Sequence, residues 1–387
     1  MNPKTLNAIQ STVLQTTAHN AYAWGREADA ARLYREAAER EQETGRIAAK
    51  LNARRWEGNS LMWAGQHDEA LRVLIEVAAC NHPEADPNPV YGAKTDCIML
   101  SLFHARASSI KMLLSEARAY LDRIGRPEWR HRLDLLTSIL LFGQGRLQEA
   151  LQSALLANRL RQAAIDGPHY ADLSHLKWIT RPLFFLREEG QLSQWAQLAD
   201  RQPITMLSDR LRVHCIRILI ARLRRAAGLD PHNLFDDAPA AAATVTEARQ
   251  SWDEVFEVGR ALMLVGDWNT LERLPMEKTD ICPFNLAVFV VDREINLLRR
   301  KLGLVPWDPD LNWPCELPDT IPQASTVPAS DTSNLQDALV HLAAAARLED
   351  QRLETSACSQ TAAKRTHHAR ALLRAAGIQI QGGSFES

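Results

Sequence analysis

The chain has 387 residues, of which 46% are hydrophobic and 24% are charged, and its formal net charge is −2. These values are ordinary for a soluble globular protein, and the slightly acidic balance gives no reason to expect nucleic acid or a membrane surface as a partner. The six cysteines are scattered without Cys-x-x-Cys spacing, which favours reduced thiols. Since neither a secretion signal nor an apolar run of membrane-spanning length is visible, we expect a cytoplasmic protein.

Turn positions recur about every forty residues along residues 1–304. Between the turns, apolar side chains are spaced three and four residues apart, which indicates helices with one buried stripe. Each unit is a pair of helices that cannot bury its apolar face alone, so about seven stacked pairs are expected to form an all-α solenoid. The predicted turns lie at Gly25, Gly65, a position near Ala105, Gly145, Gly190, Gly228, Gly266 and Gly303.

Several helices can be predicted within this pattern. In chain order, residues 27–44, 172–189 and 252–265 each read as one helix. The β-branched run at residues 288–291 continues with helical spacing, so a helix is expected there as well. A proline-rich insertion at residues 82–89 indicates a loop.

The composition changes after residue 304. Six prolines lie within residues 305–334, which predicts a linker, and leucines at helical spacing predict a C-terminal helical segment over residues 335–377. Residues 378–387 are expected to be a flexible tail.

Residues 56–74 show the repeating unit most clearly. Gly58 lies within the first helix, Gly65 ends it, and Ala70 lies in the second helix, so two small residues allow the helices to approach closely. The same features recur at Gly145, Leu147, Ala150 and Ala157. These positions resemble the tetratricopeptide repeat (TPR) family. Because the period near forty exceeds the family's repeat of about thirty-four residues, longer helices are expected.

The resemblance implies a groove lined by the first helix of each pair. Counting back from the turns, it assigns eight side chains to this groove: Asn52, Arg55, Asn59, Lys177, Arg181, Arg222, Arg225 and Arg260. Arg55 with Asn59 is similar to one half of the clamp by which some TPR domains hold a peptide's terminal carboxylate, and Lys177 with Arg181 is similar to the other half. The alternative is that arginine is simply abundant and that the longer repeat shifts the register, which would place these side chains in solvent.

No local motif indicates catalysis. Gly143 and Gly145 resemble the start of a dinucleotide fingerprint, but the third glycine and the preceding strand are missing. We therefore expect no enzyme, cofactor or metal. The leading hypothesis is an adaptor or scaffold whose concave groove binds an acidic peptide or partner protein, and the alternative is a regulatory protein that responds to a peptide or small ligand.

Overall fold

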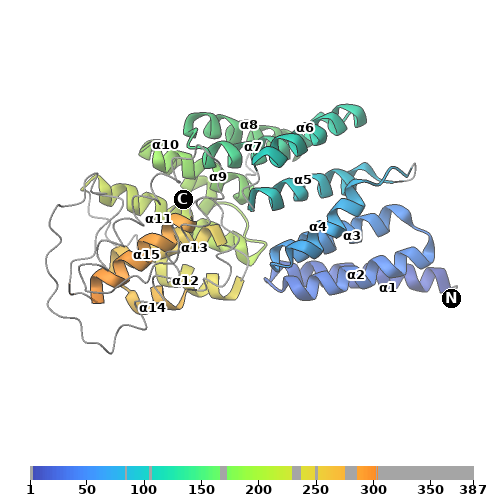
Figure 1. The fold of residues 1–387 in the computed structure, drawn as a ribbon, viewed down its shortest axis with the longest axis horizontal. Helices are drawn as coiled ribbons and strands as arrows, with labels where there is room; N and C mark the ends of the chain where they lie inside the picture. The colour runs from blue at the N-terminus through green and yellow to red at the C-terminus, as the bar shows by residue number, and fades with distance from the viewer. Residues whose placement is uncertain are drawn as a thin grey trace, which may run out of the picture.

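The computed structural model describes residues 3–82, 85–103, 107–165, 172–228, 237–248, 252–274, 286–301 and 303. Within these ranges the chain forms fifteen α-helices and one short 3-10 helix and contains no strand (Figure 1). The predicted all-α class is confirmed. The predicted linker, C-terminal segment and tail (305–334, 335–377 and 378–387) lie outside the described residues.

The helices follow one another with short connections. The first nine elements are α1 (Pro3–Ala23), α2 (Glu27–Thr44), α3 (Ile47–Trp63), α4 (His67–Ala78), α5 (Pro87–Phe103), α6 (Ala107–Ile124), η1 (Pro127–Trp129), α7 (Arg130–Gly143) and α8 (Leu147–Ile165). The others are α9 (Leu173–Phe185), α10 (Glu189–Asp200), α11 (Leu207–Ala226), α12 (Asp237–Ala248), α13 (Trp252–Val265), α14 (Trp268–Arg273) and α15 (Leu286–Lys301). The helices predicted at residues 27–44 and 252–265 occur at those bounds, and the segment around residues 288–291 is helical as expected.

The helices pack in the order of the chain. From α1 to α14 each helix packs against the next one. From α3 onward, each odd-numbered helix also packs against the next odd-numbered helix, as far as α15 (Figure 1). The odd-numbered helices thus form a continuous row, and their side chains can meet across large separations in sequence.

Left-handed residues end the first helix of most pairs. Six predicted turn glycines have φ angles between 68° and 79°: Gly25, Gly65, Gly145, Gly228, Gly266 and Gly303. At Gly65 the turn is closed by a hydrogen bond from its N–H to the carbonyl of Met62 (3.1 Å) and by one from Gln66 to Leu61 (2.9 Å). This double bond pattern satisfies carbonyls that the helix end leaves without a partner. The position near Ala105 lies outside the described residues.

The predicted turn at Gly190 is wrong. Gly190 lies inside α10, and the helix predicted over residues 172–189 ends at Phe185. Arg187 takes the left-handed conformation instead, with a φ of 60°, and its N–H bonds to the carbonyl of Phe184 (3.0 Å). An arginine can occupy this position at a cost of about 1–2 kcal/mol, so the turn carries no glycine signal in the sequence.

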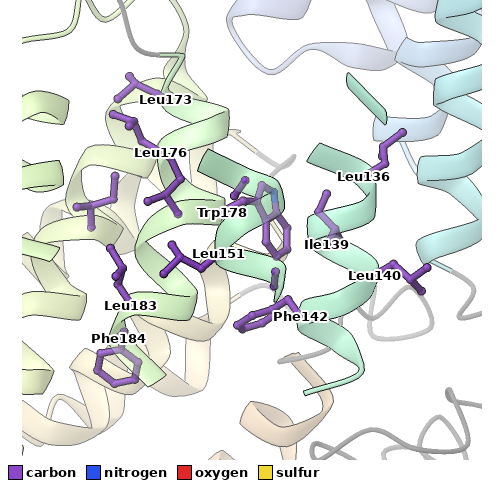
Figure 2. Packing of buried hydrophobic residues seen from close by; sticks show 14 of the residues in the cluster. Leu136, Ile139, Leu140, Phe142, Leu151, Leu173, Leu176, Trp178, Leu183 and Phe184 are labelled. Atoms are coloured by element: carbon purple, nitrogen blue, oxygen red, sulfur yellow. The ribbon is translucent and has the colours of Figure 1, made fainter. Parts of the chain in front are cut away.

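The largest apolar core runs from α5 to α11. Figure 2 shows Phe142 of α7 facing Trp178 of α9, and their ring centroids lie 5.9 Å apart in an edge-on arrangement. Alanines at the pair interfaces, including Ala150 and Ala154, are fully buried. Large aromatic side chains therefore fill the space between successive odd-numbered helices, while small side chains keep the two helices of a pair close.

Two glycines mark places where helices meet too closely for a side chain. A Cβ atom at Gly58 would lie 2.7 Å from Cγ of Leu74, which confirms the close approach predicted between α3 and α4. A Cβ atom at Gly259 in α13 would lie 2.0 Å from the ring of Phe289, a fully buried residue of α15. The α13–α15 contact therefore depends on the absence of a side chain at residue 259.

A Gly259→Ala substitution should lower the free energy of unfolding by about 1–3 kcal/mol, because the buried Phe289 ring must leave its packed position. Gly190→Ala is the matched control, since a Cβ atom there meets nothing within 4 Å. In α10 the same change should raise stability by up to about 1 kcal/mol through helix propensity. Urea denaturation of both variants measures the difference, and equal effects of the two substitutions would contradict the close approach.

Candidate partner-binding surface

All eight candidate residues lie on odd-numbered helices. Asn52, Arg55 and Asn59 belong to α3, and the others belong to α9 (Lys177, Arg181), α11 (Arg222, Arg225) and α13 (Arg260). With the turn placed at Arg187, three of the arginines occupy the same place in their units, six residues before the turn: Arg181, Arg222 and Arg260. The corrected register thus strengthens the correspondence between these units.

Four of the candidate cations meet carboxylates of later helices. Lys177 Nζ lies 2.6 Å from Oε1 of Glu254, and Nε of Arg181 lies 3.6 Å from Oε1 of Glu257. Arg222 also donates to Glu257, and Arg260 pairs with Asp292 of α15. We refer to these seven residues as the charged cluster. It joins α9, α11, α13 and α15 and contains four cations and three carboxylates.

The charged cluster is almost completely enclosed. Arg222 is 1% exposed, Arg260 is 3% exposed and Glu257 is 0% exposed. Neither the groove accessible to a partner nor the alternative of solvated side chains describes these residues. A charge removed from water to this extent requires a partner of opposite sign, and Glu257 serves two guanidinium groups at once.

Aromatic rings support the buried arginines. The guanidinium carbon of Arg222 lies 4.5 Å from the ring centroid of Phe184 and 5.3 Å from that of Phe256. Arg260 lies 5.3 Å from the other contact of the same Phe256 ring. Such cation–π contacts stabilise a guanidinium in an apolar setting. Phe256 thereby connects the pair formed by Arg222 and Glu257 to the pair formed by Arg260 and Asp292.

Arg55 belongs to a separate pair at the start of the chain. Its Nε and Nη2 atoms donate to the two carboxylate oxygens of Asp96 in α5, at 2.8 and 3.2 Å. The guanidinium also stacks 4.4 Å from the ring of Trp56. The missing side chain at Gly92 makes room for it, since a Cβ atom there would lie 2.8 Å from Nε of Arg55. This bidentate geometry is the strongest form of an arginine–carboxylate contact.

The remaining candidates lie apart from the charged cluster's ion pairs. Asn59 is buried, and its Oδ1 atom has no hydrogen-bond donor in the described part of the chain. Asn52 is half-buried and donates to Oε1 of Gln15 in α1 at 3.5 Å. Arg225 is half-buried near the end of α11. The structure thus brings Lys177, Arg181, Arg222 and Arg260 together, whereas Asn52, Arg55 and Asn59 lie on α3.

Sequence reasoning missed the carboxylates that hold the cations. Asp96, Glu254, Glu257 and Asp292 all lie on odd-numbered helices, as do their partners. A search for acidic residues at the inward positions of the following unit could have found Glu254 and Glu257, which precede the turn at Gly266 by twelve and nine residues.

Two buried histidines lie between the two groups of ion pairs. The rings of His131 in α7 and His175 in α9 have centroids 5.6 Å apart. Asp172, the N-cap residue of α9, lies 3.7 Å from Nδ1 of His175. Burial lowers the pKa of His131 to about 3, with further contributions from His175 and from Arg132 and Arg161. His131 is therefore held in its neutral form.

The described residues contain no group of three or more His, Cys, Asp or Glu side chains arranged to hold a metal ion. None of the described helices combines the length and the apolar character needed to cross a membrane. Comparison with protein-family models and with curated proteins finds no match to this chain.

The lowered pKa of His131 predicts a pH dependence of stability. Between pH 6.5 and about 3 the unfolded chain binds a proton that folded His131 does not. The free energy of unfolding should therefore fall as the pH is lowered through this window, by up to about 1.4 kcal/mol per pH unit from this group. His131→Gln removes the proton, so its stability should fall less steeply in urea denaturation between pH 6.5 and about 4.5.

The exposed His19 of α1 offers the matched control, since His19→Gln makes the same change away from the buried pair. Parallel stability profiles for wild type and His131→Gln would contradict the neutral, buried state of His131.

Proposed function

We propose that the chain is a TPR-like α-solenoid that acts as a protein–protein interaction scaffold. It holds an acidic peptide or a segment of a partner protein along the face formed by the odd-numbered helices. The observation that carries the proposal is that side chains far apart in the sequence share this face, as Lys177 and Glu254 do across 77 residues at 2.6 Å. Successive helix pairs thus build one surface, which is the property that a repeat scaffold needs.

Buried ion pairs favour binding because they fix this surface in advance. A surface that is already ordered loses less conformational entropy when a partner binds. The charged cluster carries one more cation than carboxylates, although the whole chain has a formal net charge of −2. This local excess of positive charge supports an acidic partner by charge complementarity.

The candidate residues fall into two roles. Arg181, Arg222 and Arg260 are buried, so their role is to shape the face. The half-buried side chains of Asn52, Arg55, Lys177 and Arg225 are the ones that contact the partner. On this proposal the chain binds without catalysis, needs no cofactor and works in the cytoplasm.

Arg225 and Arg224 give a matched pair for testing the proposal. Arg224 donates to Glu189 of α10 at 2.8 Å and so faces an even-numbered helix. Its neighbour Arg225 points elsewhere because adjacent helical residues do not share a face. Arg225→Gln should reduce capture of the acidic partner from a lysate of the native cell by several-fold, as quantified by mass spectrometry, whereas Arg224→Gln should not.

Salt provides a second readout of the same experiment. Binding that depends on charge attraction weakens as salt screens the charges, so the captured partner should be released as the salt concentration is raised. Equal capture by wild type and Arg225→Gln, or a partner without an acidic segment, would contradict the proposed face.

A further inference from the structure

Two arginines near the buried histidines differ from every candidate discussed so far. Arg132 lies near the start of α7 and Arg161 near the end of α8. Because the turn at Gly145 joins these helices into an antiparallel pair, both arginines lie at the same end of it. Both side chains are half-buried. We refer to Arg132 and Arg161 as the arginine pair.

The arginine pair lacks the carboxylate partners that hold the other inward-facing arginines. Within the described ranges, no carboxylate lies at ion-pair distance from Arg132 or Arg161. Nε of Arg161 is buried and has no hydrogen-bond acceptor among the described residues. Arg132 lies 6.0 Å from the ring centroid of Tyr91, which stacks on Trp129. An aromatic wall thus positions one guanidinium without neutralising it.

The electrostatic surroundings of the arginine pair are unfavourable for two cations. Burial lowers the pKa of Arg132, and the nearby Arg55 and Arg161 lower it further, while Asp96 acts in the opposite direction. Asp96 is already engaged by both donor atoms of Arg55. Half-buried guanidinium groups that repel one another leave this part of the fold in need of an anion.

We propose that Arg132 and Arg161 form a binding site for a carboxylate group of the acidic partner. The site deepens the proposed function and rests on it. Guanidinium groups bind a carboxylate through paired, charge-assisted hydrogen bonds, and here two forks lie at one end of a helix pair. An aspartate or glutamate side chain, or a terminal carboxylate, supplies the missing negative charge.

The neighbouring charges favour a carboxylate over a phosphate. Asp96 acts on Arg132, and Asp172 acts on the adjacent His131, so two carboxylates already face this region. His131 is neutral there and adds no positive charge. A group with a single negative charge balances the arginine pair without strong repulsion from Asp96 and Asp172, whereas a group with two negative charges meets more of it.

The full-length chain tests this proposal with a fluorescein-labelled tetraglutamate peptide as the probe. Arg132→Gln and Arg161→Gln should each weaken binding of the probe by about tenfold or more, because each removes charge-assisted hydrogen bonds. Arg159→Gln is the matched control, since Arg159 is exposed on the same helix as Arg161 and the change in charge is identical. This control should bind the probe as wild type does.

Thermal unfolding separates binding from folding. Since the arginine pair is repelled by its neighbours, both glutamine variants should melt at the wild-type temperature or above it. A clear fall in melting temperature would overturn the proposal, because it would show that the arginines stabilise the fold. Wild-type binding of the probe by either variant would also overturn it.

Two further outcomes distinguish the alternatives. Displacement of the probe by inorganic phosphate at lower concentration than by free glutamate would overturn the assignment to a carboxylate. Failure of the wild-type chain to bind the probe would overturn this site alone, while capture of a partner that depends on Arg225 would leave the proposed function standing.

Discussion

The rest of the structure depends on ion pairs that are buried between odd-numbered helices. Arg222 and Arg181 share Glu257, Arg260 pairs with Asp292, and Arg55 pairs with Asp96. Removing such charges from water costs several kcal/mol for each ion unless the partner is held in good geometry. Since each pair links helices that belong to different units, the requirement for a partner also restricts how the units stack. Packing of apolar side chains alone would tolerate more variation in this arrangement.

This constraint also separates two kinds of arginine on the inner helices. An arginine with a buried carboxylate partner, such as Arg222, is part of the folded framework and is not available to a ligand. Arg132 and Arg161 have the same kind of position but no such partner among the described residues. The difference explains how a slightly acidic chain can present local positive charge, and it moves the expected contact with an acidic partner away from the most buried residues.

Much of the fold could be predicted because the repeat leaves a strong local signal. Glycines with positive φ mark most turns, and helical spacing marks α2 and α13 at their observed bounds. The turn at Arg187 could not be predicted, because an arginine in the left-handed conformation looks like any other arginine in a sequence. The cations of the site followed from their position before each turn. Their carboxylate partners did not, because Glu257 precedes its turn by nine residues and Asp292 precedes Gly303 by eleven. Pairing between units therefore has no fixed spacing.

A double-mutant cycle between Arg222 and Glu257 tests most directly whether buried ion pairs hold the helices together. The free energy of unfolding would be measured by urea denaturation for Arg222→Gln, Glu257→Gln and the double variant. The account predicts that each single change is strongly destabilising and that the two are coupled by about 2 kcal/mol or more, because either change alone leaves a buried charge without its partner. Effects that add to within about 0.5 kcal/mol would contradict it, since independent sites behave in that way.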